Sequence, residues 1–342
     1  MHFGTFAEFN TRVGKTQAQT LRESLREVLQ AEASGMDSVW LAEDHFSPEN
    51  TIMGSPFTIA GAVAALTSRV RIGMGVVLLP LHNPIRVAEE AATVDLLSDG
   101  RLDFGVGRSP VLVNYKGFNI PYDEARDRLS EGLEVVKKAW TQETFSHRGE
   151  YWSFQDVRLV PRPYQSPHPP IWFAASSEES FVQAGEMGLS ILVPSVTGFP
   201  KLVERVAVYR RVRREAGFPG PGEVMLRIPA YAAETMAKAR SEPEPSTMHK
   251  VELRAKILLP NIVSEDVARE FQKASQVSYD DILRDSVMYG TPEAIVDRIQ
   301  GYREMLGLSG VILETNLGGQ VPIDLVENSI RLLAARVMPA FK

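Results

Sequence analysis

The alternation of strand-like and helix-like segments constrains the fold of this chain more than any other feature. Short apolar runs are each followed by a stretch of helical periodicity, and this unit occurs eight times. The expected strands are Phe3–Glu8, Ser38–Ala42, Val70–Leu79, Leu102–Val106, Pro170–Ala175, Ser190–Pro194, Val224–Ala230 and Gly310–Glu314. Continuous apolar strands that alternate with helices are typical of a parallel sheet covered on both faces. Eight such units favour an α/β fold of the closed (β/α)8, TIM-type barrel class over an open doubly wound sheet.

The chain is longer than a minimal barrel of about 250 residues, and most of the excess of its 342 residues lies between Glu234 and Tyr289. This insertion after strand seven begins with the polar run Ser241-Glu242-Pro243-Glu244-Pro245-Ser246 and then becomes helical. Long insertions in compact domains are often functional. We therefore expect one barrel domain over residues 1–342, with residues 234–289 as an active-site lid. A surface hairpin is expected over Phe145–Pro163, with Gly149 near its turn.

Composition excludes several classes of function. The chain has no cysteine, which removes thiolate nucleophiles, cysteine-ligated zinc, iron–sulfur clusters and disulfides. Its net charge is −6, and its one basic cluster, Arg210–Arg214, lies on a helical pattern, so we expect no nucleic-acid partner. No apolar run reaches the roughly 18–20 residues of a membrane span, and Met1–Phe6 does not resemble a signal peptide. We expect a cytoplasmic protein without membrane contact.

Polar side chains follow several expected strands, and reacting groups in such barrels project from the carboxyl ends of the strands. Strand two ends at Glu43-Asp44-His45. His45 is the candidate acid or base, since an imidazole exchanges protons near neutral pH and a neighbouring acid can orient it. We take Asp44 as its candidate catalytic neighbour. Glu43 and Asp44 are sequential, so we expect them to point apart and not to share a proton. His82 is interpreted as structural.

A second group of residues suggests an anion site. Arg108 follows strand four, and Ser176 and Ser177 follow strand five at the start of a helix. The free N–H groups of a helix N-terminus bind phosphate, although Ser in this position also acts simply as a cap. Gly105-Val106-Gly107-Arg108 is only half of a dinucleotide-binding fingerprint, since Pro110 replaces the third glycine. We expect backbone and guanidinium to approach an anion there.

Other catalytic signatures are missing from the sequence. It contains no Gly-x-Ser-x-Gly elbow, no His-Glu-x-x-His segment and no Walker-type phosphate loop. The six histidines are scattered along the chain, so a histidine-based metal site would need distant strands to converge. We expect no metal site.

Five segments resemble the bacterial luciferase-like flavin-dependent monooxygenases. Glu43-Asp44-His45-Phe46 is similar to the Glu-His-His-Phe segment of that family. Residues 73–86 resemble its third strand and the loop that follows, and Leu97–Arg108 resembles its fourth-strand signature, the most specific of the set. Gly290-Thr291-Pro292-Glu293 and Asn316-Leu317-Gly318-Gly319 match its late turns. The similarity extends from Phe3 to Met338.

The resemblance implies a TIM-type barrel that uses reduced FMN and O2, through a flavin C4a-hydroperoxide, to oxygenate a small organic substrate. Arg108, Ser176 and Ser177 would then bind the FMN phosphate, with Arg126 or Arg128 as a further contact. Gly75-Val76 would form a non-prolyl cis peptide beneath the flavin ring, and Glu43 would lie near the ring. Asp44 replaces the first family histidine, which puts light emission and aldehyde oxidation in doubt and leaves His45 as the candidate base.

The resemblance also implies partners and leaves alternatives. Relatives take reduced FMN from a separate NAD(P)H:flavin reductase and associate as homodimers through helices near strands two and three, where Ala60–Ala65 would allow close contact. One alternative is a deazaflavin-dependent oxidoreductase of the same superfamily. Another is a non-catalytic flavin-binding protein. A metal-dependent barrel hydrolase is the third alternative and the least favoured one. The substrate is not readable from the sequence.

Overall fold

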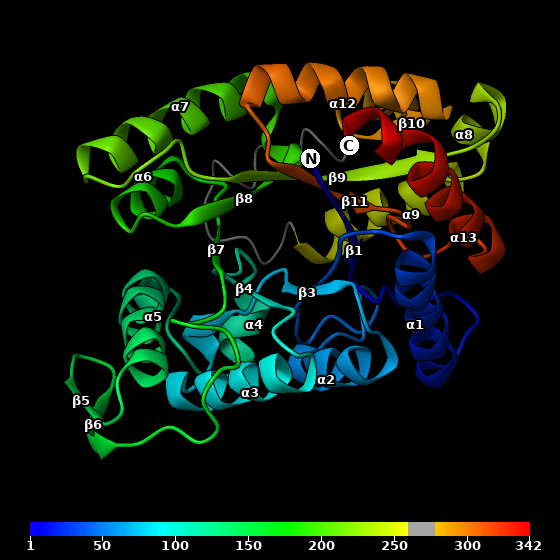
Figure 1. Ribbon diagram of the computed structural model, residues 1–342. Helices are drawn as coiled ribbons and strands as arrows, with labels where there is room; N and C mark the ends of the chain where they lie inside the picture. The colour runs from blue at the N-terminus through cyan, green and yellow to red at the C-terminus, as the bar shows by residue number, and fades with distance from the viewer. Residues whose placement is uncertain (259–277) are drawn as a thin grey trace.

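Eight parallel strands close into a barrel in the computed structural model, which describes residues 1–258 and 278–342. The barrel strands are β1 (His2–Ala7), β2 (Ser38–Leu41), β3 (Arg71–Met74), β4 (Leu102–Val106), β7 (Ile171–Ala174), β8 (Ser190–Pro194), β9 (Val224–Ala232) and β11 (Gly310–Glu314). They pair in this order, with β11 beside β1 and β8 beside β9, so the sheet has no free edge among them. The predicted (β/α)8 fold is confirmed (Figure 1).

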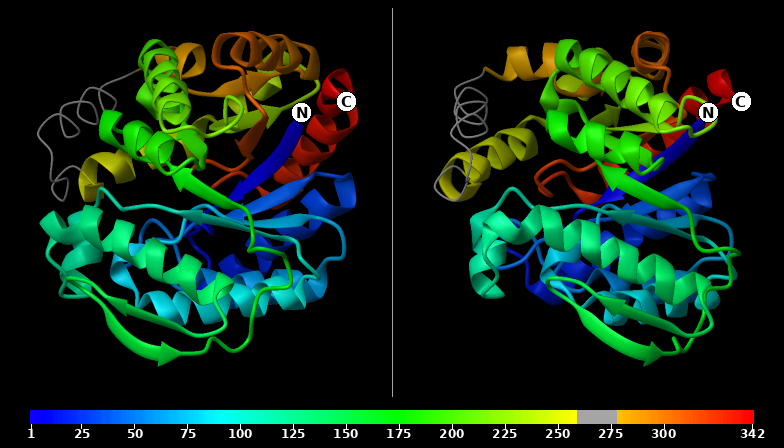
Figure 2. Two further views of the ribbon diagram at one scale, coloured as in Figure 1. Left: turned by 60° about the vertical axis from the view of Figure 1, so that its left-hand side comes forward. Right: turned by 90° about the vertical axis from the view of Figure 1, so that its left-hand side faces the viewer.

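Helices cover the outside of the barrel. The main ones are α1 (Gln17–Ser34), α2 (Pro56–Leu66), α3 (Pro84–Leu97), α5 (Ala125–Thr141), α6 (Glu178–Glu186), α7 (Phe199–Glu215), α12 (Pro292–Leu306) and α13 (Ile323–Leu332). Figure 2 shows α2, α3 and α5 below the strands and α6, α7 and α12 above them. A short α4 (Leu112–Gly117), which the sequence analysis did not predict, follows β4. The predicted hairpin is present as β5 (Phe145–Arg148) and β6 (Ser153–Val157).

Apolar side chains fill the barrel and the layer between strands and helices. The inside of the barrel is packed by Phe6, Trp40, Ala42, Trp172, Leu192, Met225 and Ile312. Trp40 and Trp172 meet edge to face, with ring centroids 5.8 Å apart. Such packing stabilises a barrel as a solid core and confines open space to its ends.

The third strand is shorter than predicted. The apolar run Val70–Leu79 predicts one strand, but β3 ends at Met74. The Gly75–Val76 peptide bond is cis, Val77 forms only an isolated bridge with Val106, and Leu79–Leu81 is a 3-10 turn. The backbone N–H of Leu78 leaves the sheet and donates to the Glu43 carboxylate, 2.8 Å away. A polar group outside the strand therefore redirects this segment.

The insertion after β9 is partly described. It contains α8 (Met236–Ser241), α9 (Glu244–Leu253), a π-helical turn (Arg254–Leu258), α11 (Tyr279–Asp285) and β10 (Met288–Gly290). β10 pairs in parallel with the end of β9 and was not predicted. The remainder of the expected lid, residues 259–277, lies outside the described residues. No helix in the described part of the chain is long and apolar enough to span a membrane.

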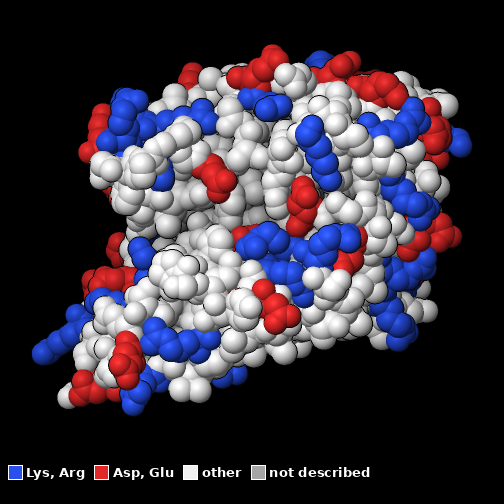
Figure 3. Space-filling view, in the orientation of Figure 1, with Lys and Arg blue, Asp and Glu red and all other residues white. Residues whose placement is uncertain are grey.

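Charged side chains of both signs are interspersed over the face of the molecule drawn in Figure 3. Basic groups in the described structure are commonly paired. Arg71, at the start of β3, binds Asp103 of β4 at 2.7 Å. Pairing of this kind at the amino ends of the strands links neighbouring strands and leaves the carboxyl ends for other chemistry.

Candidate active site

Glu43 is the centre of a polar cluster at the carboxyl ends of β2 and β3. One of its oxygens, Oε1, lies 2.7 Å from Nε2 of His45 and 2.5 Å from Nε2 of His82. The other, Oε2, accepts the Leu78 N–H. Only 1% of the Glu43 side chain is exposed. Since both oxygens are occupied by protein donors, Glu43 fixes the two rings; the sequence analysis expected it near the flavin.

In this cluster the pKa of Glu43 is lowered and the pKa of His82 is raised, so both shifts favour the charged forms. Burial alone would raise the pKa of Glu43, but hydrogen bonds from His45, His82 and the Leu78 N–H lower it to about 2. Burial likewise opposes protonation of His82, yet its hydrogen bond to Glu43 and the charge of that carboxylate raise its pKa. A carboxylate and a half-buried imidazolium are therefore favoured together.

Asp44 points away from Glu43, as predicted. Its carboxylate accepts from the side-chain amides of Asn50 and Asn114, each at 3.0 Å, and from the backbone N–H of His45. Burial raises its pKa, and these hydrogen bonds partly oppose that shift. The acid that contacts the His45 ring is thus Glu43, while Asp44 holds the backbone at that position.

His82, interpreted as structural from the sequence, contacts Glu43 and so is part of this polar cluster. Its position is set by the next residue, Asn83, whose side chain caps α3 by accepting from the Ile85 N–H at 3.0 Å. The scattered histidines were expected to need distant strands to converge; two of the six, His45 and His82, come together because β2 and β3 are neighbours. Ligand-type atoms of Glu43, His45 and His82 lie within 4.8 Å of one another. Hydrogen bonds account for this arrangement, and we assign no metal to it.

Glycines let the loop after β3 pack against β4. A Cβ on Gly105 would lie 1.9 Å from the Met74 carbonyl oxygen, and one on Gly107 would lie 2.8 Å from Val76 Cγ2. These glycines are therefore required by protein packing, where the sequence analysis expected them to admit an anion. They position Val76, which packs against the barrel interior on one side and the Leu78, Leu81 and Tyr115 cluster on the other.

The structure brings the predicted phosphate-binding residues together. β4 and β7 are adjacent, so Arg108 and the Ser176-Ser177 pair follow neighbouring strands. Ser177 precedes α6 without a side-chain cap, and its buried Oγ has no hydrogen-bond partner among the described residues. Arg108 likewise has no hydrogen bond or ion pair to the described part of the chain. Ser176 is exposed.

Acidic residues are also present at this end of α6. Its first turn contains Glu178 and Glu179. The N–H group at the helix start and the nearby Ser177 hydroxyl lower the pKa of Glu179, and the charges of Arg126 and Arg108 add to the effect. Arg126 lies 3.9 Å from the Glu179 carboxylate. The two arginines thus converge on the α6 N-terminus, whereas Arg128 pairs with Glu124 at 2.7 Å.

Two buried ion pairs lie across the barrel from Arg108, and sequence reasoning missed three of their four members. Arg227 of β9 binds Glu314 of β11 at 2.7 Å, with its guanidinium 3.7 Å from the centre of the Phe6 ring. Lys250 of α9 binds Glu8, which follows β1, at 2.7 Å. An arginine inside the apolar run of a strand was the available signal for Arg227.

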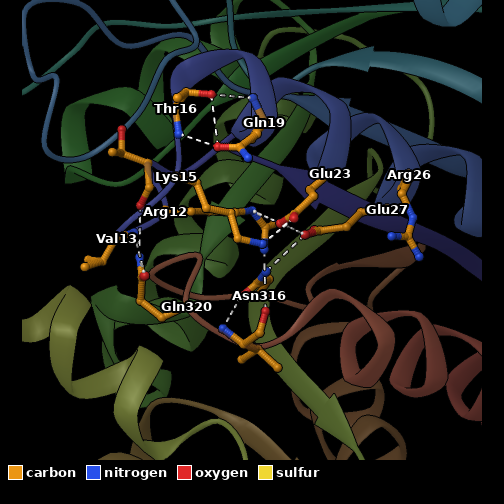
Figure 4. A network of polar contacts seen from close by, with 12 residues as sticks. Arg12, Val13, Lys15, Thr16, Gln19, Glu23, Arg26, Glu27, Asn316 and Gln320 are labelled. Carbon is orange, nitrogen blue, oxygen red and sulfur yellow. Dashed lines mark hydrogen bonds and ion pairs between the residues drawn. The ribbon is translucent and has the colours of Figure 1, made fainter.

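A further network fixes the loop between β1 and α1 (Figure 4). Arg12 binds Glu27 and lies 3.3 Å from Glu23, and Asn316 donates to Glu27 at 3.0 Å. Beside it a cavity of about 10 Å³ is lined by Glu8, Arg12, Glu314 and their neighbours. That volume is close to what a single water requires. The loops after β1 and β11 are therefore held together by polar contacts.

Known proteins share this architecture over most or all of the chain. The luciferase-like monooxygenase family matches residues 1–309. The oxygenase component of flavin-dependent trigonelline monooxygenase from Acinetobacter baylyi is 27% identical, over 100% of this chain and 96% of its own length. An F420-dependent glucose-6-phosphate dehydrogenase from Kineococcus radiotolerans is 32% identical, over 57% of this chain and 59% of its own.

A solved structure agrees with these sequence matches. The crystal structure of monooxygenase RslO1 from Streptomyces bottropensis superposes with a TM-score of 0.85, at 27% identity and with 100% of both chains covered. The barrel, the Glu43 cluster and the family match lead to one conclusion: this chain belongs to the luciferase-like monooxygenase family.

Proposed function

We propose that this chain is the oxygenase component of a two-component monooxygenase, which takes reduced FMN from a separate NAD(P)H:flavin reductase and uses O2 to oxygenate a small organic substrate. The observation that carries the proposal is that Arg108, which follows β4, converges with the uncapped N-terminus of α6, which follows the neighbouring strand β7. The trigonelline relative, named as a flavin-dependent oxygenase component, supports it.

The residues present fit a flavin mononucleotide. Buried polar atoms without a partner among the described residues include Ser177 Oγ, Tyr115 Oη and Trp172 Nε1. Such orphaned groups are costly unless a ligand satisfies them. Arg108 and Ser177 would hold the phosphate, with Arg126 nearby. The ring would lie on the side chain of Val76, at the mouth of the apolar barrel interior.

Reduced FMN, when bound, would supply the electrons that activate O2. The residues of this chain would then manage protons and water. With Nε2–H of His45 donating to Glu43, Nδ1 carries the lone pair and is the atom that can accept a proton. A positioned base of this kind contributes about 10²–10⁴-fold to rate. The low exposure of Glu43 and His45 keeps bulk water from the pair.

An F420-dependent oxidoreductase is the second candidate. The observation that favours it is the dehydrogenase relative, which is 32% identical over 203 residues. Such an enzyme would transfer hydride and consume no O2. A flavin-binding protein without catalysis would bind FMN and show neither reaction.

The proposal is tested by O2 uptake with reduced FMN supplied by a flavin reductase, together with FMN titrations of two variants. Arg108→Ala removes a charge-assisted contact of about 1.5–3 kcal/mol, so FMN should bind roughly 10- to 150-fold more weakly. His45→Ala should keep FMN affinity and lower turnover. Arg148→Ala, on the exposed hairpin, is the control.

Each outcome separates the alternatives. Unchanged FMN affinity in Arg108→Ala would place the phosphate elsewhere. Unchanged turnover in His45→Ala would remove that ring from the reaction. Hydride transfer from reduced F420 without O2 uptake would establish the second candidate.

A further inference from the structure

Helix α9 lies near β11 and β1 (Figure 1), and its polar side chains contact the segments after β1 and β11 and the strand β10. Ser246 Oγ donates to the Leu317 carbonyl at 2.6 Å, and Thr247 lies 2.8 Å from the Tyr289 hydroxyl. Lys250 Nζ reaches Glu8 at 2.7 Å. These positions form one stripe of the helix, and a residue four places after Lys250 continues it. That residue is Arg254.

Arg254 lies among charged groups that are already paired. It follows Lys250 by one helical turn, and Lys250 contacts Glu8. Burial lowers the pKa of Arg254, and the charges of Glu314 and Glu8 oppose that shift. Glu314 is bound by Arg227 at 2.7 Å and Glu8 by Lys250 at 2.7 Å. Within residues 1–258 and 278–342, the Arg254 side chain has no hydrogen bond or ion pair, although its backbone N–H caps α9.

Among the described residues, the Arg254 guanidinium is the cation of this group without a direct ion-pair partner. Glu8 pairs with Lys250 and Glu314 with Arg227, and the nearby Asp44 carboxylate accepts from the amides of Asn50 and Asn114. A partly buried guanidinium without a counterion is unfavourable, and an anion that hydrogen-bonds to it would relieve the cost.

The position of Arg254 argues against the flavin phosphate as that anion. In the closed strand order, β11 and β1, whose carboxyl ends lead to Glu314 and Glu8, lie opposite β4 and β7, which lead to Arg108 and Ser177. A flavin held by its phosphate at Arg108 would extend its ring toward the barrel centre. Arg254 would then face the far side of the ring, where a substrate would bind.

We propose that Arg254 binds the carboxylate of an anionic organic substrate, an assignment that rests on the proposed function and narrows its substrate class. Guanidinium and carboxylate match as planar bidentate partners. Lys250 and Arg227 are held by their own carboxylates and orient the site without neutralising the substrate.

The test measures binding to the flavin-free protein, without reductase or turnover. Acetate and benzoate are compared with their neutral amides, acetamide and benzamide, by calorimetric titration and by thermal unfolding. Arg254→Gln should weaken carboxylate binding roughly 10- to 150-fold, the loss of one hydrogen-bonded charge contact, and leave amide binding unchanged. The matched control is Lys256→Gln, which removes a 74% exposed cation from the same helical segment. Lys256→Gln should change neither carboxylate binding nor amide binding.

Thermal unfolding keeps the test valid if binding is weak. Without added anion, Arg254→Gln should melt at or above the wild-type temperature, because it removes an uncompensated charge, and it should lose the stabilisation that benzoate gives the wild type. The proposal is overturned if wild-type protein does not prefer either carboxylate over its amide. It is also overturned if Arg254→Gln and Lys256→Gln behave alike, or if Arg254→Gln weakens FMN or inorganic phosphate instead. None of these results depends on whether the enzyme consumes O2.

Discussion

A single carboxylate oxygen holds both imidazoles of the candidate active site. Oε1 of Glu43 contacts His45 and His82, and Oε2 is taken by a backbone N–H. The position of each ring therefore depends on the charge of Glu43. The stability of the site therefore depends on pH. The contribution of Glu43 is lost as pH falls, and the contribution of His82 is lost as pH rises.

The pH dependence follows from the two pKa shifts. The pKa of Glu43 is lowered from 4.5, so its contribution to stability is present above that value and is lost as pH falls toward about 2. The pKa of His82 is raised from 6.5, so its contribution is complete below that value and is lost as pH rises through the folded-state pKa. The interaction is strongest between the two ordinary values.

We expect His82→Asn to destabilise the protein most within that window. At about pH 5.5 the free energy of unfolding should fall by about 1.5 kcal/mol, the lower end for a hydrogen bond between charged groups, because His82 is 29% exposed. At about pH 8.5 the loss should be smaller, because that pH lies well above the ordinary value of 6.5 and part of the His82 contribution has then been lost. Urea unfolding at both pH values measures the difference.

The control for this experiment is His168→Asn, since that ring contacts the Pro169 carbonyl, 2.8 Å away, and not a carboxylate. A loss in His82→Asn that is equal at the two pH values would show that the ring acts by packing alone.

Residues that end a strand were easier to identify than residues that reach the site from elsewhere. His45 follows β2 directly, so the barrel rule points to it. His82 lies beyond a 3-10 turn after β3, and its contact with Glu43 depends on the path of residues 75–81. Lys250 comes from α9, and nothing in its local sequence indicates the partner Glu8, which is 242 residues away.

At the scale of elements, the contact between the β3 loop, β4 and β7 sets the position of Val76. The apolar run Val70–Leu79 correctly predicts a third strand but not where it stops. Gly105 and Gly107 let the loop approach, and that requirement arises only from the packed arrangement. The closed sheet and most covering helices were predictable from periodicity. β10, α4 and the redirected loop were not, because long-range contacts form them.

We expect Gly107→Ala to disturb this junction. The added Cβ would lie 2.8 Å from Val76 Cγ2 and 2.9 Å from the Ala174 Cβ, and neither neighbour is the end of a flexible side chain. Overpacking of this kind costs about 1–3 kcal/mol. Denaturant unfolding should show that loss, and FMN affinity should fall with it if Val76 supports the ring.

Gly301→Ala provides the matched control. Gly301 lies exposed in α12, and an added Cβ there meets nothing within 4 Å. It should stabilise the protein by about 0.5–1 kcal/mol, the helix preference of alanine over glycine. If both variants had the same small effect, the close approach of the β3 loop would not constrain residue 107.

At the scale of the whole molecule, the barrel separates two kinds of charge chemistry. The side of β4 and β7 offers Arg108 and a helix N-terminus, whereas the side of β1, β9 and β11 offers paired ions and Arg254. The mouth of the packed apolar interior between them would receive a ring system. The barrel architecture was predicted from the sequence, but this division depends on which strand ends face one another across its mouth.

The surface outside β2 and β3 carries apolar groups that a monomer does not use. Leu66 at the end of α2 is 56% exposed, and Leu97 at the end of α3 is also 56% exposed. The two helices pack against each other, since a Cβ on Gly61 of α2 would lie 3.9 Å from Leu97 Cδ1. Neighbouring exposed leucines are typical of an interface. We therefore propose that a second copy of the chain covers this face.

We expect Leu97→Glu to weaken self-association at least about tenfold, because it would place a charge without a partner inside an apolar contact. Light scattering after size-exclusion chromatography, over a range of protein concentrations, measures the mass of each form. Met305→Glu alters an equally accessible apolar residue of α12, 51% exposed, and should leave the mass unchanged.

A wild-type protein that is monomeric at all concentrations, or a Leu97→Glu variant that stays dimeric, would place the interface elsewhere or exclude it. A site completed within one barrel would then keep full FMN affinity in the monomeric variant, because Arg108 and Ser177 follow the carboxyl ends of β4 and β7, whereas Leu66 and Leu97 lie at the amino end of the barrel.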